Sequence, residues 1–260
     1  MPNIVSWSGG KDSTATIILA HEKGIKIDLI ITAFVWFDKS RKIYGDTPEK
    51  IDWINNCAKP IFESWGYPVK IVSSDKDYMH YFFMKRKSAI KHPEHIGKYY
   101  GFLIGGFCRM QREKEQPINQ YLRSKFGKEY INIVGICSDE PARLERLHNS
   151  KNQRSILYEY GYTQFDAKMK CKEYNLLAPW YGIDRKRDGC WFCPNQGLPE
   201  LAALKINHPV LWEELEKLSR VENTVARGFK YGIPFQEINR QVDEYIKNPP
   251  PKQLSLFDVI

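Results

Sequence analysis

SWSGGKDS, residues 6–13, stands between a short apolar run and a segment with helical periodicity. NIVSW at residues 3–7 is typical of a buried strand, and TATIILAHEKG at residues 14–24 places apolar residues on one helical face before a glycine. Glycines at such a junction let backbone N–H groups approach an anion, Lys11 adds positive charge, and the helix N-terminus adds its dipole. The stretch therefore predicts a phosphate-binding loop.

This loop differs from the Walker loop, in which the spacing is longer and the lysine directly precedes Ser or Thr. Here Asp12 follows Lys11. A carboxylate beside a polyphosphate is repulsive unless it caps the helix or holds Mg²⁺. The sequence leaves both roles open for Asp12.

Strands and helices alternate along the following residues. Strands are expected at residues 27–37, 67–74 and 130–136, with helices between them, which predicts an α/β fold with a parallel sheet and helices on both faces. The last part of the chain is mainly helical and carries a CxxC motif. The expected organisation is a nucleotide-binding domain at residues 1–180, a helical cysteine-bearing subdomain at 181–246 and a flexible tail at 247–260.

The composition of the chain indicates which kinds of partner it favours and where in the cell it is expected. A net charge of +8 favours nucleotides or nucleic acid as partners, although a basic surface also keeps a protein soluble. The longest apolar run, residues 29–37, is far short of the roughly 20 residues that span a membrane. With no signal peptide before the loop, we expect a cytoplasmic protein without membrane contact, whose six cysteines are thiols or metal ligands.

SGGKDS, residues 8–13, resembles the signature of the PP-loop ATP pyrophosphatase superfamily. The resemblance implies an adenine nucleotide alpha hydrolase-like fold that binds ATP with Mg²⁺ and cleaves between the α and β phosphates. Lys11 and Asp12 would be catalytic, with Lys11 and the loop amides stabilising charge on the leaving group. The implied nucleotide site consists of Ser6, Ser8, Gly9, Gly10, Lys11, Asp12 and Ser13.

Later motifs resemble the phosphoadenosine phosphosulfate (PAPS) reductase branch of this superfamily, over roughly residues 1–200. VWFD ends in Asp38, a candidate for Mg²⁺ or ribose contact. GICSDEPARLERL, residues 135–147, carries Arg143, which would contact a substrate phosphate or sulfate and which Asp139 and Glu140 would order. Cys137 departs from the branch, because it stands where a first arginine is expected.

GCWFCP, residues 189–194, places Cys190 and Cys193 at a spacing that lets two thiolates hold one metal or cluster. Iron–sulfur members of the family carry a Cys-Cys pair where this chain has Phe107 and Cys108. The resemblance implies a [4Fe–4S] cluster on Cys108, Cys190 and Cys193, with Cys137 as a possible fourth ligand. Structural Zn²⁺ and ordinary reduced thiols are the alternatives.

No cysteine follows Cys193, although sulfonucleotide reductases of this branch need a nucleophilic thiol on their tail. A PP-loop with cluster cysteines but without the tail thiol better resembles the sulfur-inserting members of the superfamily. Those members adenylate an oxygen in tRNA or help to replace a DNA phosphate oxygen with sulfur. We therefore expect an ATP-dependent transferase that acts on nucleic acid or a nucleotide. The alternatives are a PAPS or adenosine phosphosulfate (APS) reductase with an external thiol, and a nucleotide-binding regulatory module tethered to a clamp.

Residues 85–101 interleave lysines with Tyr99 and Tyr100, which suits contact with DNA or RNA but also an ordinary solvated loop. His92 and His95 in this stretch are close enough in sequence to chelate a metal. An intervening proline and the lack of a third ligand argue against that role.

The tail contains QLSLF, residues 253–257, which resembles the peptide by which bacterial proteins bind the DNA sliding clamp. Leu254, Leu256 and Phe257 would fill an apolar groove on the clamp, and Gln253 would anchor the polar end. The same side chains could instead fold back onto their own domain.

Overall fold

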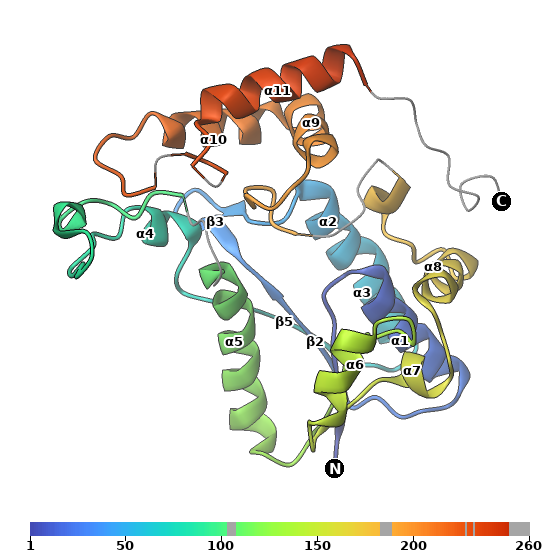
Figure 1. Ribbon diagram of the computed structural model, residues 1–260. Coiled ribbons are helices and arrows are strands. Elements are labelled where there is room, and N and C mark those ends of the chain that lie inside the picture. The colour runs from blue at the N-terminus through green and yellow to red at the C-terminus, as the bar shows by residue number, and fades with distance from the viewer. Residues whose placement is uncertain (103–107, 183–188, 227, 231, 250–260) are drawn as a thin grey trace. The chain divides into compact units, whose positions relative to one another are not determined.

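The structure, a computed structural model, describes residues 1–102, 108–182, 189–226, 228–230 and 232–249 (Figure 1). The chain forms two compact units. The first consists of Met1–Met79 and Arg109–Cys190, and the second of His80–Cys108 and Trp191–Ile260.

This division differs from the expected boundary at residue 180, because the inserted segment His80–Cys108 belongs with the C-terminal helices. Backbone hydrogen bonds explain the difference: Tyr99 N donates to Asn223 O at 2.9 Å, and Val225 N donates to Tyr99 O at 2.8 Å. The chain therefore passes between the two units three times, after Met79, after Cys108 and after Cys190, and not once near residue 180.

The first unit contains a five-stranded sheet whose neighbouring strands are all parallel. β1 is the middle strand, and its Val5 pairs with Ile30 on one side and Ile133 on the other. The predicted α/β architecture is confirmed, although the short last strand was not foreseen. The sheet order is β5 (Val69–Ser73), β2 (Leu29–Phe34), β1 (Asn3–Ser6), β6 (Ile131–Ile133) and β7 (Gln153–Arg154).

Helices cover both faces of this sheet, as predicted. Alternate strand residues point to opposite faces, so Val5 and Ile30 belong to one apolar core and Ile4 and Leu29 to another. The first core includes residues of α1, α3 and α8, whereas α5 contributes Leu122 to the second, and Figure 1 shows α5 across the sheet from the other three. Their bounds are α1 (Lys11–Glu22), α3 (Lys59–Ser64), α5 (Arg109–Phe126) and α8 (Gln164–Glu173).

The predicted strand at residues 27–37 is interrupted. β2 ends at Phe34, and β3 (Trp36–Asp38) pairs antiparallel with β4 (Ile43–Tyr44) in a separate two-stranded sheet. Gly45 N donates to Val35 O at 2.7 Å, and the Trp36 ring stacks on Tyr44 at 4.0 Å, which turns the chain into a hairpin.

A helix is formed between the segments 27–37 and 67–74, as expected, but it contains a wider π-helical turn. α2 (Pro48–Trp53) continues through η1 (Ile54–Ala58) into α3. Pro60 has no backbone N–H to donate within this helix, and the wider turn lies just before it. The remaining short helices outside the C-terminal part are α4 (Tyr78–Phe82), η2 (Pro93–His95), α6 (Pro141–His148), α7 (Ile156–Glu159) and η3 (Pro179–Gly182).

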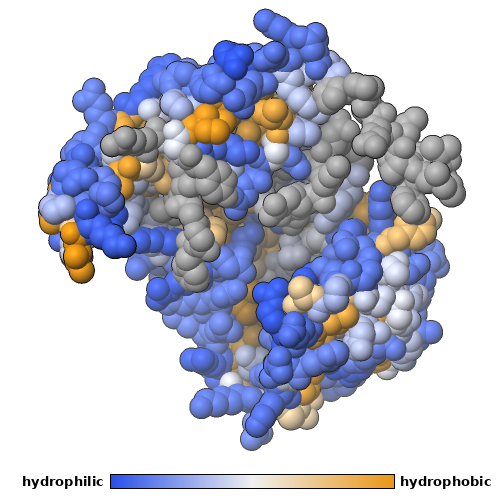
Figure 2. Space-filling view, viewed as in Figure 1, coloured by the Kyte–Doolittle hydropathy of each residue, from blue (hydrophilic) through white to orange (hydrophobic). Residues whose placement is uncertain are grey.

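The second unit is mainly helical, as expected. It contains α9 (Leu198–Asn207), α10 (Pro209–Ser219) and α11 (Phe235–Lys247), and the Phe229 ring lies 5.2 Å from Phe102 and 6.1 Å from Phe235. Among the described residues, no helix has the length and apolar character needed to cross a membrane. Hydrophilic residues cover most of the face drawn in Figure 2, with hydrophobic residues in smaller groups among them.

Candidate functional site

The predicted phosphate loop lies at the carboxyl end of the middle strand. Ser6 Oγ donates to Asn132 Oδ1 on β6 at 2.8 Å, and Trp7 N donates to Ile31 O on β2 at 2.8 Å. The chain therefore leaves β1 between its two neighbouring strands. This is the switch point at which open parallel sheets commonly bind ligands.

The loop needs glycine at residue 9 for both conformation and space. Gly9 has φ +80°, a left-handed conformation that favours glycine. A Cβ on Gly9 would lie 3.0 Å from Ile54 Cδ1 and 3.3 Å from Lys50 Cε. The loop backbone at Gly9 thus packs directly against the helix formed by α2 and η1.

Hydroxyl groups hold the loop at the start of α1. Ser8 N donates to Ser13 Oγ at 3.2 Å, and Gly10 N donates to Ser8 Oγ at 3.2 Å. Lys11 N donates to the Tyr181 hydroxyl at 3.1 Å. That hydroxyl marks a position where an anionic oxygen would accept from the helix N-terminus.

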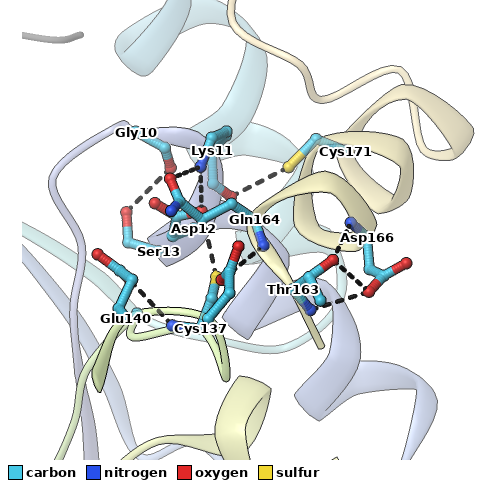
Figure 3. Close-up of polar contacts among 12 residues, drawn as sticks. Gly10, Lys11, Asp12, Ser13, Cys137, Glu140, Thr163, Gln164, Asp166 and Cys171 are labelled. Carbon is cyan, nitrogen blue, oxygen red and sulfur yellow. Dashed lines mark hydrogen bonds and ion pairs between the residues drawn. The ribbon is translucent and has the colours of Figure 1, made fainter. Parts of the chain in front are cut away.

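Asp12 does not cap the helix. The N-cap residue is Gly10, which has no side chain, and the first helical N–H, that of Lys11, donates to the Tyr181 hydroxyl instead. Asp12 is the second helical residue, and its Oδ1 lies 2.5 Å from Lys11 Nζ (Figure 3). Of the two roles that the sequence left open, helix capping is therefore wrong.

Cys137 and Glu140 lie beside this aspartate. Cys137 Sγ donates to Asp12 Oδ1 at 3.5 Å, and Cys137 N donates to Glu140 Oε2 at 3.0 Å (Figure 3). One ligand atom from each of the three residues lies within 4.8 Å of the others. The two carboxylates offer the hard oxygen ligands that Mg²⁺ prefers.

Cys137 is suited to remain a neutral thiol. Burial, reinforced by the Asp12 carboxylate, raises the pKa of Cys137 well above its usual range. Its role as a possible fourth ligand of a cluster stays a prediction. Cys171 is buried in the apolar core; its Sγ donates to Lys11 O at 3.2 Å, and burial raises the pKa of Cys171 to about 12.

Arg143 lies beside the loop through two contacts. Its Nη1 donates to Glu140 Oε1 at 2.6 Å, and its Nη2 donates to Gly135 O at 3.2 Å. Its side chain is 44% exposed, so the guanidinium can also meet a ligand. Glu140 orders this arginine as expected, whereas Asp139 accepts from Gln164 N at 3.1 Å.

Gln164 is placed by a capping box at the start of α8. Thr163 N donates to Asp166 Oδ2 at 2.8 Å, and Asp166 N donates to Thr163 Oγ1 at 3.2 Å. Lys11 Nζ then reaches Gln164 Oε1 at 3.4 Å (Figure 3). A segment far along the chain therefore contributes to the surroundings of Lys11.

Asp38 lies on the β3–β4 hairpin with its own partners. Its carboxylate accepts from Ser40 Oγ at 2.6 Å and from Arg41 Nε at 2.6 Å. Burial favours the neutral acid, but these hydrogen bonds outweigh it and hold the pKa of Asp38 below its usual range. Its predicted contact with Mg²⁺ or ribose stays a prediction.

The sequence reasoning missed a buried ion pair behind the loop. Lys50 Nζ lies 2.9 Å from Asp46 Oδ1, and their side chains are 4% and 1% exposed. Lys114 Nζ lies 3.9 Å from the same oxygen. Burial raises the pKa of Asp46, but the two ammonium groups outweigh it and lower the pKa. The only sequence signal was the i,i+4 spacing.

The other predicted cysteine ligands have mixed exposure. Cys108 is exposed, and Cys190 and Cys193 are half-buried. Gln196 N donates to Cys193 O at 3.2 Å, so the CxxC segment continues into a tight turn. Cys137 and Cys190 belong to the first unit, and Cys108 and Cys193 to the second. A cluster shared among them stays a prediction.

Two sequence features fall outside the described residues: Phe107, which precedes Cys108, and the clamp-like peptide at residues 253–257. No protein-family model matches the chain, and no curated protein matches it. The function is therefore inferred from the chain's own residues.

Proposed function

We propose that the chain binds the phosphates of ATP at residues 8–13 and catalyses cleavage between the α and β phosphates. The observation that supports this most directly is the glycine loop at the end of the middle strand, which leads into a helix whose N-cap residue is Gly10. Such a helix start presents backbone donors and a positive dipole end to an anion. The adenine base and the position of cleavage follow from the resemblance of SGGKDS to PP-loop enzymes.

In the proposed reaction an acceptor oxygen attacks the α phosphorus, and the bond to the bridging oxygen breaks. Pyrophosphate leaves with the bonding electrons, and the acceptor becomes adenylated. Lys11 and the loop amides would stabilise the charge that develops on the leaving group. Lys11 is 16% exposed at its side chain, so it is accessible to a ligand at the loop.

Mg²⁺ would neutralise phosphate charge during this reaction. Asp12 and Glu140 fit that ion, because their carboxylates lie together at the loop without burial in an apolar core. Arg143 lies next to Glu140 and is the candidate contact for a phosphate or sulfate of the substrate.

The proposed acceptor is nucleic acid or a nucleotide, and the proposed chemistry is sulfur insertion. The net charge of +8 supports an anionic partner, and the exposed or half-buried Cys108, Cys190 and Cys193 support a thiolate site. Iron and acid-labile sulfide would be measured after anaerobic purification, beside Cys190→Ser. Iron and sulfide that the variant loses support sulfur chemistry. One zinc per chain would make the cysteines structural.

Lys11→Ala tests the central proposal. ATP binding is measured by calorimetry with Mg²⁺, and pyrophosphate release is measured with RNA and with DNA as acceptors. We expect the variant to lose binding and to release pyrophosphate about 10²- to 10³-fold more slowly, with an unchanged circular dichroism spectrum. Lys172→Ala, an exposed lysine in the same unit, is the matched control.

Wild-type ATP binding by Lys11→Ala would overturn the nucleotide site. ATP binding without pyrophosphate release, with either acceptor, would favour a regulatory module. Release of sulfite from PAPS or APS with an external thiol would reassign the protein as a sulfonucleotide reductase.

A further inference from the structure

The second unit carries two histidines and a glutamate at one tight turn: Glu94 and His95 lie in η2 (Pro93–His95), and His92 is its N-cap residue. One ligand atom from each of His92, Glu94 and His95 lies within 4.8 Å of the others. Glu94 Oε1 is 3.2 Å from His92 Nδ1 and 3.7 Å from His95 Nε2. Two imidazoles and a carboxylate therefore converge in a region that the proposed nucleotide site does not use.

The turn itself brings the rings together. In a 3₁₀ turn, side chains three residues apart eclipse one another. The rings of His92 and His95 accordingly stack, with centroids 5.0 Å apart and planes 26° apart. His95 N donates to His92 O at 3.0 Å, and Pro93 occupies the first turn position. The proline that argued against chelation in the sequence begins the turn that aligns the ligands.

The base of this loop is fixed by backbone hydrogen bonds. Arg86 N donates to Lys98 O at 2.9 Å, and Gly97 N donates to Arg86 O at 2.9 Å. Lys85 and Tyr99 form an antiparallel bridge next to them. The ligands are therefore presented by a closed loop, which lowers the conformational entropy lost when a metal binds.

His95 is not held as an ordinary structural histidine would be. Its side chain is 19% exposed, yet its buried Nδ1 has no hydrogen-bond partner within the described part of the chain. Buried polar side-chain atoms nearly always have a partner. Within the described residues, the ring thus contacts His92 by stacking and Glu94 through Nε2, and Nδ1 takes no part.

We propose that His92, Glu94 and His95 form a binding site for a divalent metal ion of the zinc class. Imidazole nitrogen and carboxylate oxygen are zinc ligands at about 2.0–2.2 Å, which places donors on a tetrahedral ion about 3.4 Å apart. His92 and Glu94 are each 60% exposed at the side chain, so both can rotate inward by the remaining distance. Three protein ligands leave a fourth position for water.

Cobalt titration of the full chain tests this site, because Co²⁺ replaces zinc and its visible spectrum reports the ligands. We expect one Co²⁺ with a nitrogen and oxygen spectrum, displaced by Zn²⁺ and lost in His92→Ala and in His95→Ala. Glu94→Gln should weaken the same signal. His148→Ala is the matched control, since this exposed histidine lies in the first unit and should leave the titration unchanged.

Thiolate ligation gives cobalt a strong near-ultraviolet charge-transfer band, which distinguishes the cysteines from this site. Unchanged cobalt binding in both histidine variants would overturn the proposal, and so would a spectrum with thiolate bands alone. Circular dichroism of each variant confirms that it is folded. A failed nucleotide site leaves this result unaffected, because none of the three ligands belongs to residues 8–13.

Discussion

Two lysine–aspartate pairs of the first unit have the same chemistry and very different surroundings. Lys11 and Asp12 are 2.5 Å apart with side chains 16% and 23% exposed, whereas Lys50 and Asp46 are 2.9 Å apart and 4% and 1% exposed. A partly exposed pair can exchange its partner for a ligand at modest cost, but a buried pair cannot lose one member without stranding a charge. We therefore expect the first pair to serve the proposed binding site and the second to serve the framework.

Removing the buried carboxylate should have the largest effect on stability. Asp46→Ala leaves the Lys50 ammonium buried without the oxygen 2.9 Å away. We expect a loss of about 3–5 kcal/mol in the free energy of unfolding, which is typical when one member of a buried pair is removed. Urea denaturation followed by circular dichroism measures it.

The matched control is Asp75→Ala, which removes an aspartate that also pairs with a lysine at 2.9 Å. Asp75 is fully exposed, so its loss should leave the free energy of unfolding close to that of the wild type. Equal effects of the two variants would mean that burial does not separate the two kinds of pair.

Gly135→Ala should have the next largest effect, and it tests how tightly the exposed pair is positioned. A Cβ at Gly135 would lie 2.6 Å from Ser13 N and 2.7 Å from Asp12 C, both of which are backbone atoms at the start of α1. We expect a loss of about 1–3 kcal/mol in unfolding free energy, as for other overpacked sites, together with weaker ATP binding.

Gly189→Ala controls for the substitution itself, because within the described part of the chain no atom outside its two sequence neighbours lies within 4 Å of a Cβ at that position. Wild-type stability and ATP affinity in Gly135→Ala would show that the helix start can shift without consequence. Urea denaturation and calorimetry give the two measurements.

Much of the fold could be predicted because the signals are local. The apolar run before Ser6, the glycines and the helical periodicity after Asp12 all lie within one segment, and strand, loop and helix formed there as expected. The break at Val35 and the transfer of His80–Cys108 to the second unit depend on pairing with distant or following residues. Periodicity does not encode such pairing.

The site divides in the same way. The sequence identified the loop residues and Arg143, whereas Lys50, Tyr181 and Gly135 contact the loop only through tertiary packing. The buried Lys50 looked like any lysine on a helix. Glu94 was overlooked as a third ligand because the sequence does not reveal the 3₁₀ turn that brings it between two histidines.

Asp38 offers an intermediate case with a smaller effect. Its side chain is 10% exposed, whereas its partner Arg41 is 44% exposed, so solvent screens the pair in part. Asp38→Asn should lower the unfolding free energy by about 1 kcal/mol at neutral pH. This loss of unfolding free energy reflects the hydrogen bonds that Ser40 and Arg41 donate to the ionised Asp38 carboxylate.

The pH dependence of this effect follows from the lowered pKa of Asp38. The stabilisation is complete above the unfolded pKa of about 3.9, and it is lost as pH falls through the lower folded pKa. Urea midpoints of wild type and Asp38→Asn should therefore converge as pH falls below about 4. A gap that widens in acid would contradict this assignment.

The smallest effect on stability is expected from Lys11→Ala, the variant that should abolish ATP binding. Its partner Asp12 is 23% exposed and stays hydrated, so the unfolding free energy should change by less than about 1 kcal/mol. Lys50→Ala should show the reverse, with stability lost in proportion to the buried charge left on Asp46. Unfolding free energy and ATP affinity are therefore measured for both variants. If both quantities fall together in Lys11→Ala, this lysine belongs to the framework as well.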